Sequence, residues 1–191
     1  MNQLYLLRHG ESQANLDRII SGSINYDCPL SDNGLAQAEA LGKKLADIPF
    51  NWVITSRLAR AKHTAEAILW HNNFIPEYRV ENAELDERSL GTVEGMPRDY
   101  VIEKFGKNIH DSWEAQLHSK PPGGETVFAM YQRVIPFFKS QIQPLLANNN
   151  VLLVLHYQVM RALVSYIEDE PMTNQFKYNF RNCQLLQYDY S

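Results

Sequence analysis

The chain has 191 residues, of which 45% are hydrophobic, which is enough for one sizeable core. Its net charge of −4 excludes a broad nucleic-acid-binding surface, so any binding site for an anion must be positive only locally. No apolar run is long enough to span a membrane, and no segment resembles a signal peptide. Two distant cysteines favour neither a disulfide framework nor a zinc site. We therefore expect a single cytoplasmic domain over residues 1–191, without nucleic-acid or membrane partners.

The first predicted strand contains the four consecutive apolar residues 4–7, typical of a strand buried on both faces of a parallel sheet. It stops at Arg8, His9 and Gly10. Ligands of open parallel sheets bind just beyond the carboxyl ends of the strands. A guanidinium group can bind an anion there, and an imidazole can act as nucleophile or base. The alternative is an ordinary strand end with a loop histidine.

An amphipathic helix over residues 31–45 precedes a second short strand at residues 52–56. A further helix follows at once, from about residue 58 to residue 70. Arg57 and Arg60 would lie at the start of this helix. Positive charge there is unfavourable unless an anion is bound by the free N–H groups and the two guanidinium groups. The alternative is that both arginines are solvated.

The middle of the chain is less regular. Glu84 and Asp86 lie in an acidic, loop-like stretch and are expected to be solvated. Arg88 is either a substrate contact or a surface charge. A partly amphipathic pattern then predicts an excursion at about residues 93–120 that covers the site.

Residues 151–155 form the clearest buried strand, and His156 follows it as His9 follows the first strand. A helix from about residue 158 to 168 and a last strand over residues 184–188 complete the chain. Because strands and helices alternate, the sequence predicts an α/β fold with a mainly parallel sheet.

The predicted strand ends bring two histidines and two or more arginines to one crevice. Guanidinium groups match the geometry of a phosphate, and imidazoles donate or accept hydrogen bonds, so the cluster predicts a pocket for a dianion. A neutral histidine among cations is a plausible nucleophile toward phosphorus. The leaving alkoxide then needs a carboxylic acid as proton donor, which composition alone does not identify.

Six segments in order along the chain carry a resemblance to a known family. They are LLRHGES (6–12), CPLSDNGLAQAEALG (28–42), TSRLARAKHTAE (55–66), LDERSLGTVEG (85–95), PPGGET (121–126) and VLLVLHYQVMRAL (151–163). Together they are similar to the histidine phosphatase superfamily, which includes the cofactor-dependent phosphoglycerate mutases and fructose-2,6-bisphosphatase. The resemblance implies the three-layer αβα fold of the phosphoglycerate mutases.

The resemblance also implies the catalytic roles. His9 would be the phosphorylated nucleophile and Glu87 the proton donor. Arg8, Arg60 and His156 would bind the phosphoryl oxygens and stabilise their charge in the transition state. No metal is expected, because the arginines supply the positive charge.

On the substrate side, Asn15 matches a phosphate contact of the family, and Ser21 and Gly22 match a loop that holds the phosphoglycerate carboxylate in the mutases. Further contacts are expected from residues beside the second histidine and in the excursion. The substrate-binding residues expected in this way are Asn15, Ser21, Gly22, Arg98, Tyr157 and Gln158.

The chain departs from the mutases at several positions. Tyr157 and Gln158 replace a glycine and an asparagine, and Leu90 replaces a tyrosine. Glu114 and Ala115 stand where the mutases carry two arginines. These basic and hydroxyl groups help the mutases to hold a doubly phosphorylated intermediate, so their loss favours transfer to water.

Three hypotheses follow. The first is a metal-independent phosphatase that acts on a small phosphorylated metabolite through a phosphohistidine. The second is a phosphoglycerate mutase, for which 2,3-bisphosphoglycerate would be the primer. The third is a phosphate-binding module without turnover, suggested only by Tyr157. Arg161 is expected to support the sheet or the pocket, and the histidines without a matching role are expected to be exposed: His63, His71, His110 and His118.

Overall fold

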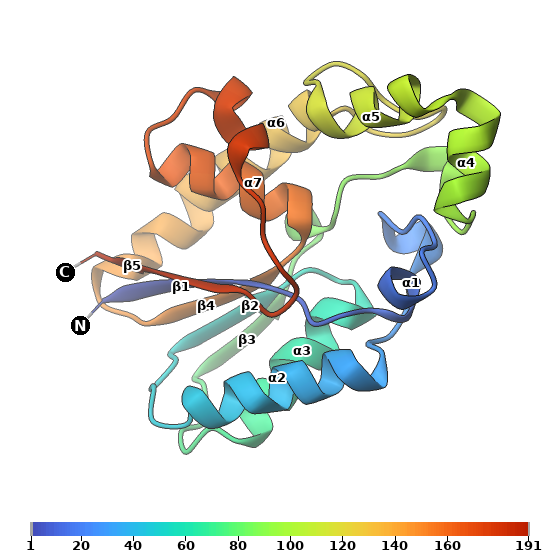
Figure 1. Ribbon diagram of the computed structural model, residues 1–191. Helices are drawn as coiled ribbons and strands as arrows, with labels where there is room; N and C mark the ends of the chain where they lie inside the picture. Colours follow the sequence, from blue (N-terminus) through green and yellow to red (C-terminus); the bar gives the residue numbers. More distant parts are fainter. Residues whose placement is uncertain (1, 191) are drawn as a thin grey trace.

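The computed structural model describes residues 2–190, in which helices cover both faces of a five-stranded sheet (Figure 1). The strand order is β3-β2-β4-β1-β5. Strands β1 to β4 run parallel, and β5 pairs antiparallel with β1 at one edge. The predicted α/β fold with a mainly parallel sheet is therefore confirmed. The strands are β1 (Gln3–Arg8), β2 (Trp52–Thr55), β3 (Tyr78–Glu81), β4 (Val151–Leu155) and β5 (Leu185–Asp189).

Alternating side chains on the central strands build two separate cores. On β1, Leu4 and Leu6 pack with α6 and α7, whereas Tyr5 and Leu7 pack on the other face with α3. Strand β4 is buried along its whole length between the two helical layers, which explains why all five of its residues are apolar. The layers contain α2 (Asp32–Lys44) and α3 (Ala59–Trp70) on one face, and α6 (Val127–Phe137) and α7 (Tyr157–Ile167) on the other.

Helices α3 and α7 begin at the carboxyl ends of β2 and β4. Neither has a side-chain cap from its own N-cap residue. Acidic side chains from distant segments accept from their first N–H groups instead. Asp27 binds the N–H of Ala59 at 2.8 Å, and Glu87 binds the N–H of Gln158 at 3.1 Å. Both helix starts therefore hold carboxylates at the same edge of the sheet.

The excursion predicted at about residues 93–120 contains two helices, separated by Gly106 in a left-handed conformation (φ +89°). It lies with α1 beyond the carboxyl ends of the parallel strands (Figure 1). A small apolar cluster that includes Ile20, Val101 and Trp113 joins it to the N-terminal segment. These helices are α1 (Gln13–Leu16), α4 (Arg98–Phe105) and α5 (Lys107–Ala115).

Strand β3 is absent from the sequence prediction. All four of its residues are exposed and it pairs only with β2, so its sequence lacks the apolar signal of a buried strand. Cys28 and Cys183 are both free. Within residues 2–190 no helix is long and apolar enough to cross a membrane. Shorter helical segments are η1 (Ile24–Tyr26), η2 (Ala83–Leu85), η3 (Gly91–Val93), η4 (Phe138–Ile142), η5 (Gln143–Ala147) and η6 (Met172–Lys177).

Candidate active site

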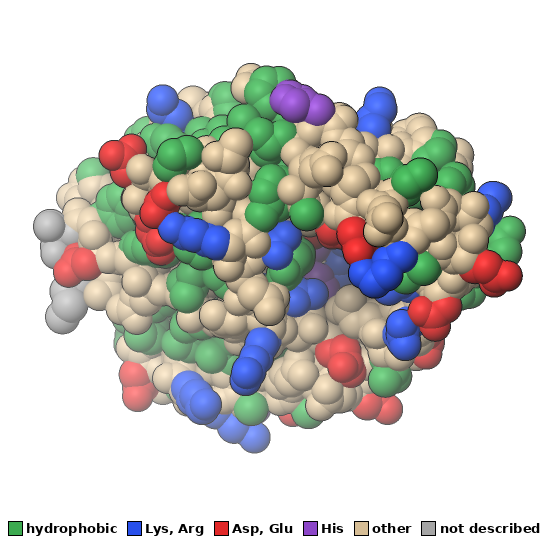
Figure 2. All heavy atoms as spheres, turned by 45° about the horizontal axis from the view of Figure 1, so that its top comes forward, with side chains coloured by type: hydrophobic (Ala, Val, Ile, Leu, Met, Phe, Trp, Pro, Cys, Tyr) green, Lys and Arg blue, Asp and Glu red, His purple; other side chains and the backbone are tan. Residues whose placement is uncertain are grey.

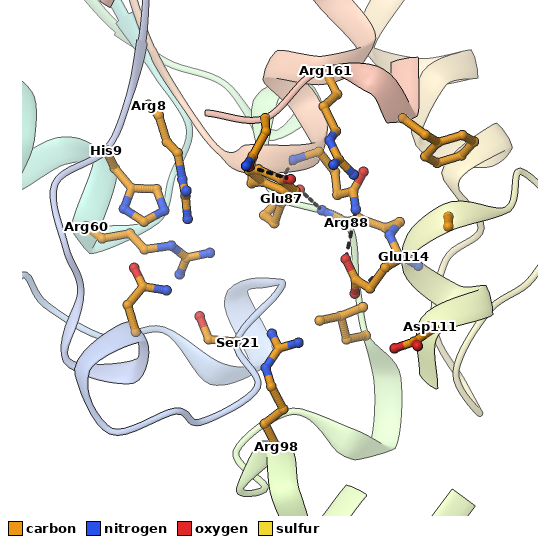
Figure 3. A pocket seen from close by; sticks show the side chains of 17 residues that line it. Arg8, His9, Ser21, Arg60, Glu87, Arg88, Arg98, Asp111, Glu114 and Arg161 are labelled. Carbon is orange, nitrogen blue, oxygen red and sulfur yellow. Dashed lines mark hydrogen bonds and ion pairs between the residues drawn. The ribbon is translucent and has the colours of Figure 1, made fainter. Parts of the chain in front are cut away.

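A cavity of about 590 Å³ opens beyond the carboxyl ends of β1 and β4. Basic and acidic side chains surround its mouth (Figure 2). Figure 3 shows Arg8, His9 and Arg60 together on one side of the cavity, Glu87 and Arg88 further across it, and Glu114 and Asp111 on the far side. The predicted site residues that line the cavity are Arg8, His9, Asn15, Ser21, Arg60, Glu87, Arg98, Tyr157 and Gln158.

The ring of His9 is fixed in one tautomer. Its Nδ1 lies 2.6 Å from the carbonyl oxygen of Gly10, and because a carbonyl only accepts, Nδ1 carries the proton. This leaves Nε2 with a free lone pair. Burial, followed by the charges of Arg60 and Arg8, lowers the pKa of His9 well below its usual value. The ring is therefore neutral at pH 7, as a nucleophile must be.

Gly10 has a packing role rather than a ligand contact. A Cβ at this position would lie 2.5 Å from the carbonyl oxygen of Gly34, in the first turns of α2. The N–H of Gly10 donates to the hydroxyl of Thr64 on α3 at 3.0 Å. Glycine therefore allows the segment after β1 to lie directly against α2, which fixes the position of His9.

His156 is fully buried, and its ring centroid lies 5.1 Å from that of His9. The hydroxyl of Ser56 accepts from the N–H of Leu58 at 3.2 Å and lies 2.6 Å from Nε2 of His156. We assign the serine hydrogen to Nε2, which places the imidazole proton on Nδ1. Burial, followed by the charge of Arg60, lowers the pKa of His156 well below its usual value.

Two guanidinium groups line the cavity with His9 (Figure 3), whereas His156 lies behind its surface. Arg60 is 2% exposed and donates to the carbonyl oxygen of Gly22 at 2.8 Å. Arg8 donates to the carbonyl oxygen of Phe180 at 2.6 Å. In this cluster, three buried nitrogens have no hydrogen-bond partner within residues 2–190: Nε of Arg8, Nη1 of Arg60 and Nδ1 of His156. Since unpaired buried donors are costly, this cluster is suited to bind an anion.

Glu87 is held by backbone donors. One carboxylate oxygen accepts from the N–H of Arg88 at 2.8 Å, and the other accepts from the N–H of Gln158 at 3.1 Å. Arg133 on α6 holds the segment before it, by donating to the carbonyl oxygens of Glu84 and Asp86 at 2.6 and 2.9 Å. The carboxyl group is therefore fixed in the wall of the cavity. Arg133 could not be assigned this role from the sequence, because it lies 46 residues from Glu87 and only the fold brings them together.

The far wall of the cavity contains a second carboxylate. Glu114, at the end of α5, accepts from Nε2 of Gln158 at 2.9 Å and from Nη2 of Arg88 at 3.3 Å. Tyr157 packs between charged groups, with its ring centroid 4.1 Å from the guanidinium carbon of Arg161 and 4.9 Å from that of Arg8. In this wall, Glu114 therefore joins Arg88 to Gln158, and the ring of Tyr157 lies between two guanidinium groups.

The remaining substrate-side predictions have mixed outcomes. Ser21 and Arg98 line the cavity, whereas Gly22 contributes its carbonyl oxygen to Arg60. The amide oxygen of Asn15 accepts from the N–H of Ser12 at 3.1 Å, so its amide nitrogen is the group available to a ligand.

Some burial predictions were wrong, and one open alternative is resolved. Asp86 is buried and accepts from Nε and Nη2 of Arg57 at 3.0 and 2.6 Å, whereas the side chain of Arg57 is about half exposed (48%). Arg88 is 1% exposed, which excludes the surface-charge alternative. His110 is buried beside Arg98, at 3.3 Å between Nε2 and Nη1. Glu84 and His71 are half-buried, whereas His63 and His118 are exposed as predicted.

The fold and the arginine- and histidine-lined cavity place the protein in the phosphoglycerate mutase-like class of enzymes. Residues 4–191 match the family model described as "Histidine phosphatase superfamily (branch 1)". The chain belongs to this superfamily.

Its relatives include both mutases and phosphatases. A 2,3-bisphosphoglycerate-dependent phosphoglycerate mutase from Cytophaga hutchinsonii is 36% identical over 167 residues, which cover 86% of this chain and 76% of the mutase. The crystal structure of the alpha-ribazole phosphatase from Shigella flexneri is 29% identical, has a TM-score of 0.85, and aligns over 99% of this chain and 91% of that one. YhfR of Bacillus stearothermophilus is 28% identical, with a TM-score of 0.84, over 97% and 89% of the two chains.

Proposed function

We propose that this protein is a phosphatase that hydrolyses a small phosphomonoester through a phosphohistidine at His9. We favour a phosphatase over a mutase because the far wall of the cavity contains the carboxylate of Glu114, which binds Arg88 and Gln158. A mutase must hold a second phosphate during turnover, and a carboxylate at this place opposes it.

In the first step, Nε2 of His9 attacks phosphorus and forms an N–P bond while the P–O bond to the leaving group breaks. The neutral ring has the free lone pair that this attack needs. The unpartnered nitrogens of Arg8, Arg60 and His156 bind the phosphoryl oxygens as their charge is redistributed. Glu87 gives its proton to the leaving oxygen.

In the second step, water attacks the phosphohistidine. An O–P bond forms, the N–P bond breaks, and the carboxylate of Glu87 takes a proton from the water. Inorganic phosphate is released and both residues return to their starting states. The guanidinium groups supply the positive charge in both steps, so the proposal requires no metal ion.

The second candidate is a phosphoglycerate mutase primed by 2,3-bisphosphoglycerate. It is favoured by the 36% identity to the mutase of Cytophaga hutchinsonii. In that case the phosphoryl group of His9 would return to a phosphoglycerate rather than pass to water. The third candidate, a binding module without turnover, has less support. The ring of Tyr157 lies against Arg8 and Arg161, and within residues 2–190 Nε2 of His9 makes no hydrogen bond that would block its lone pair.

The test is an assay against a panel of phosphomonoesters that includes 3-phosphoglycerate and fructose-2,6-bisphosphate, with and without 2,3-bisphosphoglycerate. Both free phosphate and isomer formation are measured. We expect release of phosphate without isomerisation. Isomerisation that depends on the bisphosphate would identify a mutase, and absence of both products together with tight phosphate binding would identify a binding module.

A further inference from the structure

Away from His9, the cavity is lined by the guanidinium groups of Arg88, Arg98 and Arg161 and by the carboxylates of Asp111 and Glu114. Glu114 is about one third exposed (34%) and lies on the side opposite Arg8, His9 and Arg60 (Figure 3). Within residues 2–190, its hydrogen bonds go to Arg88 and Gln158 and not to the side chains of the proposed catalytic groups.

The ion pair with Glu114 makes the guanidinium group of Arg88 less available to a bound anion. The guanidinium of Arg88 is almost fully buried and donates to Glu114 through Nη2 at 3.3 Å and to the carbonyl oxygen of Glu125 through Nη1 at 3.1 Å. With Glu114 present, Nη2 is occupied and the charge of Arg88 has a partner, although its buried Nε has no hydrogen-bond partner among residues 2–190. Without Glu114, a buried guanidinium would face the cavity and attract a second anion.

The same carboxylate orients Gln158. A carboxylate only accepts, so the amide nitrogen of Gln158 faces Glu114 and the amide oxygen is directed elsewhere. That oxygen is buried and has no hydrogen-bond partner among residues 2–190. The accessible acceptor of the far wall is therefore the carboxylate of Glu114, which is suited to hydroxyl donors of a bound molecule.

The cavity has room for such a molecule. Its volume of about 590 Å³ is typical of sites for small organic ligands and exceeds what a phosphoryl group alone requires. Leu90 and Phe176 add apolar surface to the lining.

We propose that Glu114 is a specificity-determining residue: it selects phosphomonoesters whose leaving group is uncharged and rich in hydroxyl groups, and it rejects those with a second anionic group. This inference rests on the proposed phosphatase activity and concerns the same cavity.

The test compares two substrates that differ at one group. sn-Glycerol 3-phosphate carries a CH₂OH group where 3-phosphoglycerate carries a carboxylate. We expect the wild-type protein to prefer glycerol phosphate in kcat/KM by about tenfold or more, because like charges in a partly buried site are costly. In Glu114→Gln the ratio should shift toward 3-phosphoglycerate by about tenfold, mainly through KM.

Asp111→Asn is the matched control. Asp111 lines the same cavity, but its carboxylate binds Lys107 and His110 and is half exposed. The variant loses the same charge, and we expect its substrate ratio to stay within about twofold of the wild type. An equal shift in both variants, or no shift in Glu114→Gln, would overturn the assignment.

Two further measurements separate this inference from the proposed function. Hydrolysis of p-nitrophenyl phosphate by the wild type tests the phosphatase activity alone. Calorimetric binding of glycerol phosphate and 3-phosphoglycerate tests the selectivity without turnover, in the wild type and in both variants. A wild-type protein that binds 3-phosphoglycerate as tightly as glycerol phosphate would refute the role of Glu114, whatever the variants do.

Discussion

The two ends of the cavity are built in different ways. Around His9, buried nitrogens of Arg8, Arg60 and His156 have no hydrogen-bond partner in the described chain, although Asp27 forms an ion pair with Nη1 of Arg60 at 3.7 Å. At the far end, the carboxylate of Glu114 binds the guanidinium of Arg88 and the amide of Gln158. In the proposed reaction, the first end binds the dianionic phosphoryl group, whereas Glu114 at the second end opposes a further anion. In this proposal, a general phosphate site is therefore distinct from a wall that selects the leaving group.

The largest expected effect comes from removing the nucleophile. His9→Ala should lower kcat by about 10⁴-fold or more, because the groups that remain bind phosphate but cannot accept it covalently. Steady-state hydrolysis of a phosphomonoester measures the loss. His63→Ala is the matched control, since His63 is exposed on α3, and it should retain full activity. Near-normal turnover in His9→Ala would contradict the role of His9 as the nucleophile.

The next effect concerns the proton donor. Glu87→Gln should lower kcat about 10²- to 10⁴-fold for an alkyl phosphate, whose leaving oxygen needs a proton. The loss should be smaller for p-nitrophenyl phosphate, because nitrophenolate leaves without one. The measurement is kcat for each of the two substrates, in the wild type and in the variant. Equal losses for both would indicate that Glu87 acts only by holding the N–H groups of Arg88 and Gln158.

The buried histidines should also make stability depend on pH. Burial lowers the pKa of His9 and His156, so the unfolded chain binds more protons below about pH 6.5. Stability should therefore fall as pH drops below this value, by about 1.4 kcal/mol per pH unit for each histidine. Urea unfolding at several pH values, in wild type and His156→Asn, measures the slope. The variant should lose the contribution of one histidine, and an unchanged slope would mean that His156 is protonated in the folded protein.

A smaller effect is expected at Ser56. Ser56→Ala removes the hydrogen bond to Nε2 of His156 and with it the tautomer preference, which should lower kcat/KM about tenfold or less. ¹⁵N NMR of the imidazole nitrogens measures the tautomer directly. In the wild type, Nδ1 of His156 should be protonated and Nε2 should not. The reverse assignment, with the proton on Nε2, would leave Nδ1 without a hydrogen to donate to the phosphate.

The end of the cavity around His9 could be predicted from the sequence because each of its residues lies next to a short segment with a clear apolar pattern. Arg8 and His9 follow one buried strand, His156 follows another, and Arg60 lies in the first turn of a helix after a third. The apolar strands mark these positions, and a parallel sheet brings their carboxyl ends to one edge.

The far end could not be predicted in this way. Gln158 and Glu114 are 44 residues apart, and Arg88 and Glu114 are 26 apart, so only the folded chain joins them. The same reason explains the wrong burial predictions. A charged residue such as Asp86 is expected to be exposed unless a partner is known, and its partner, Arg57, comes from another part of the fold. Strand β3 was missed because its exposed residues carry no apolar pattern.

In the proposed reaction, the phosphoryl group is transferred first to His9 and then to water. The most direct test is to mix the protein with a ³²P-labelled phosphomonoester, quench in alkali within the first turnover, and map the labelled peptide. We expect an alkali-stable, acid-labile phosphoryl group on His9 that disappears as labelled inorganic phosphate accumulates. A label on another residue, or phosphate release without any labelled protein, would contradict the mechanism.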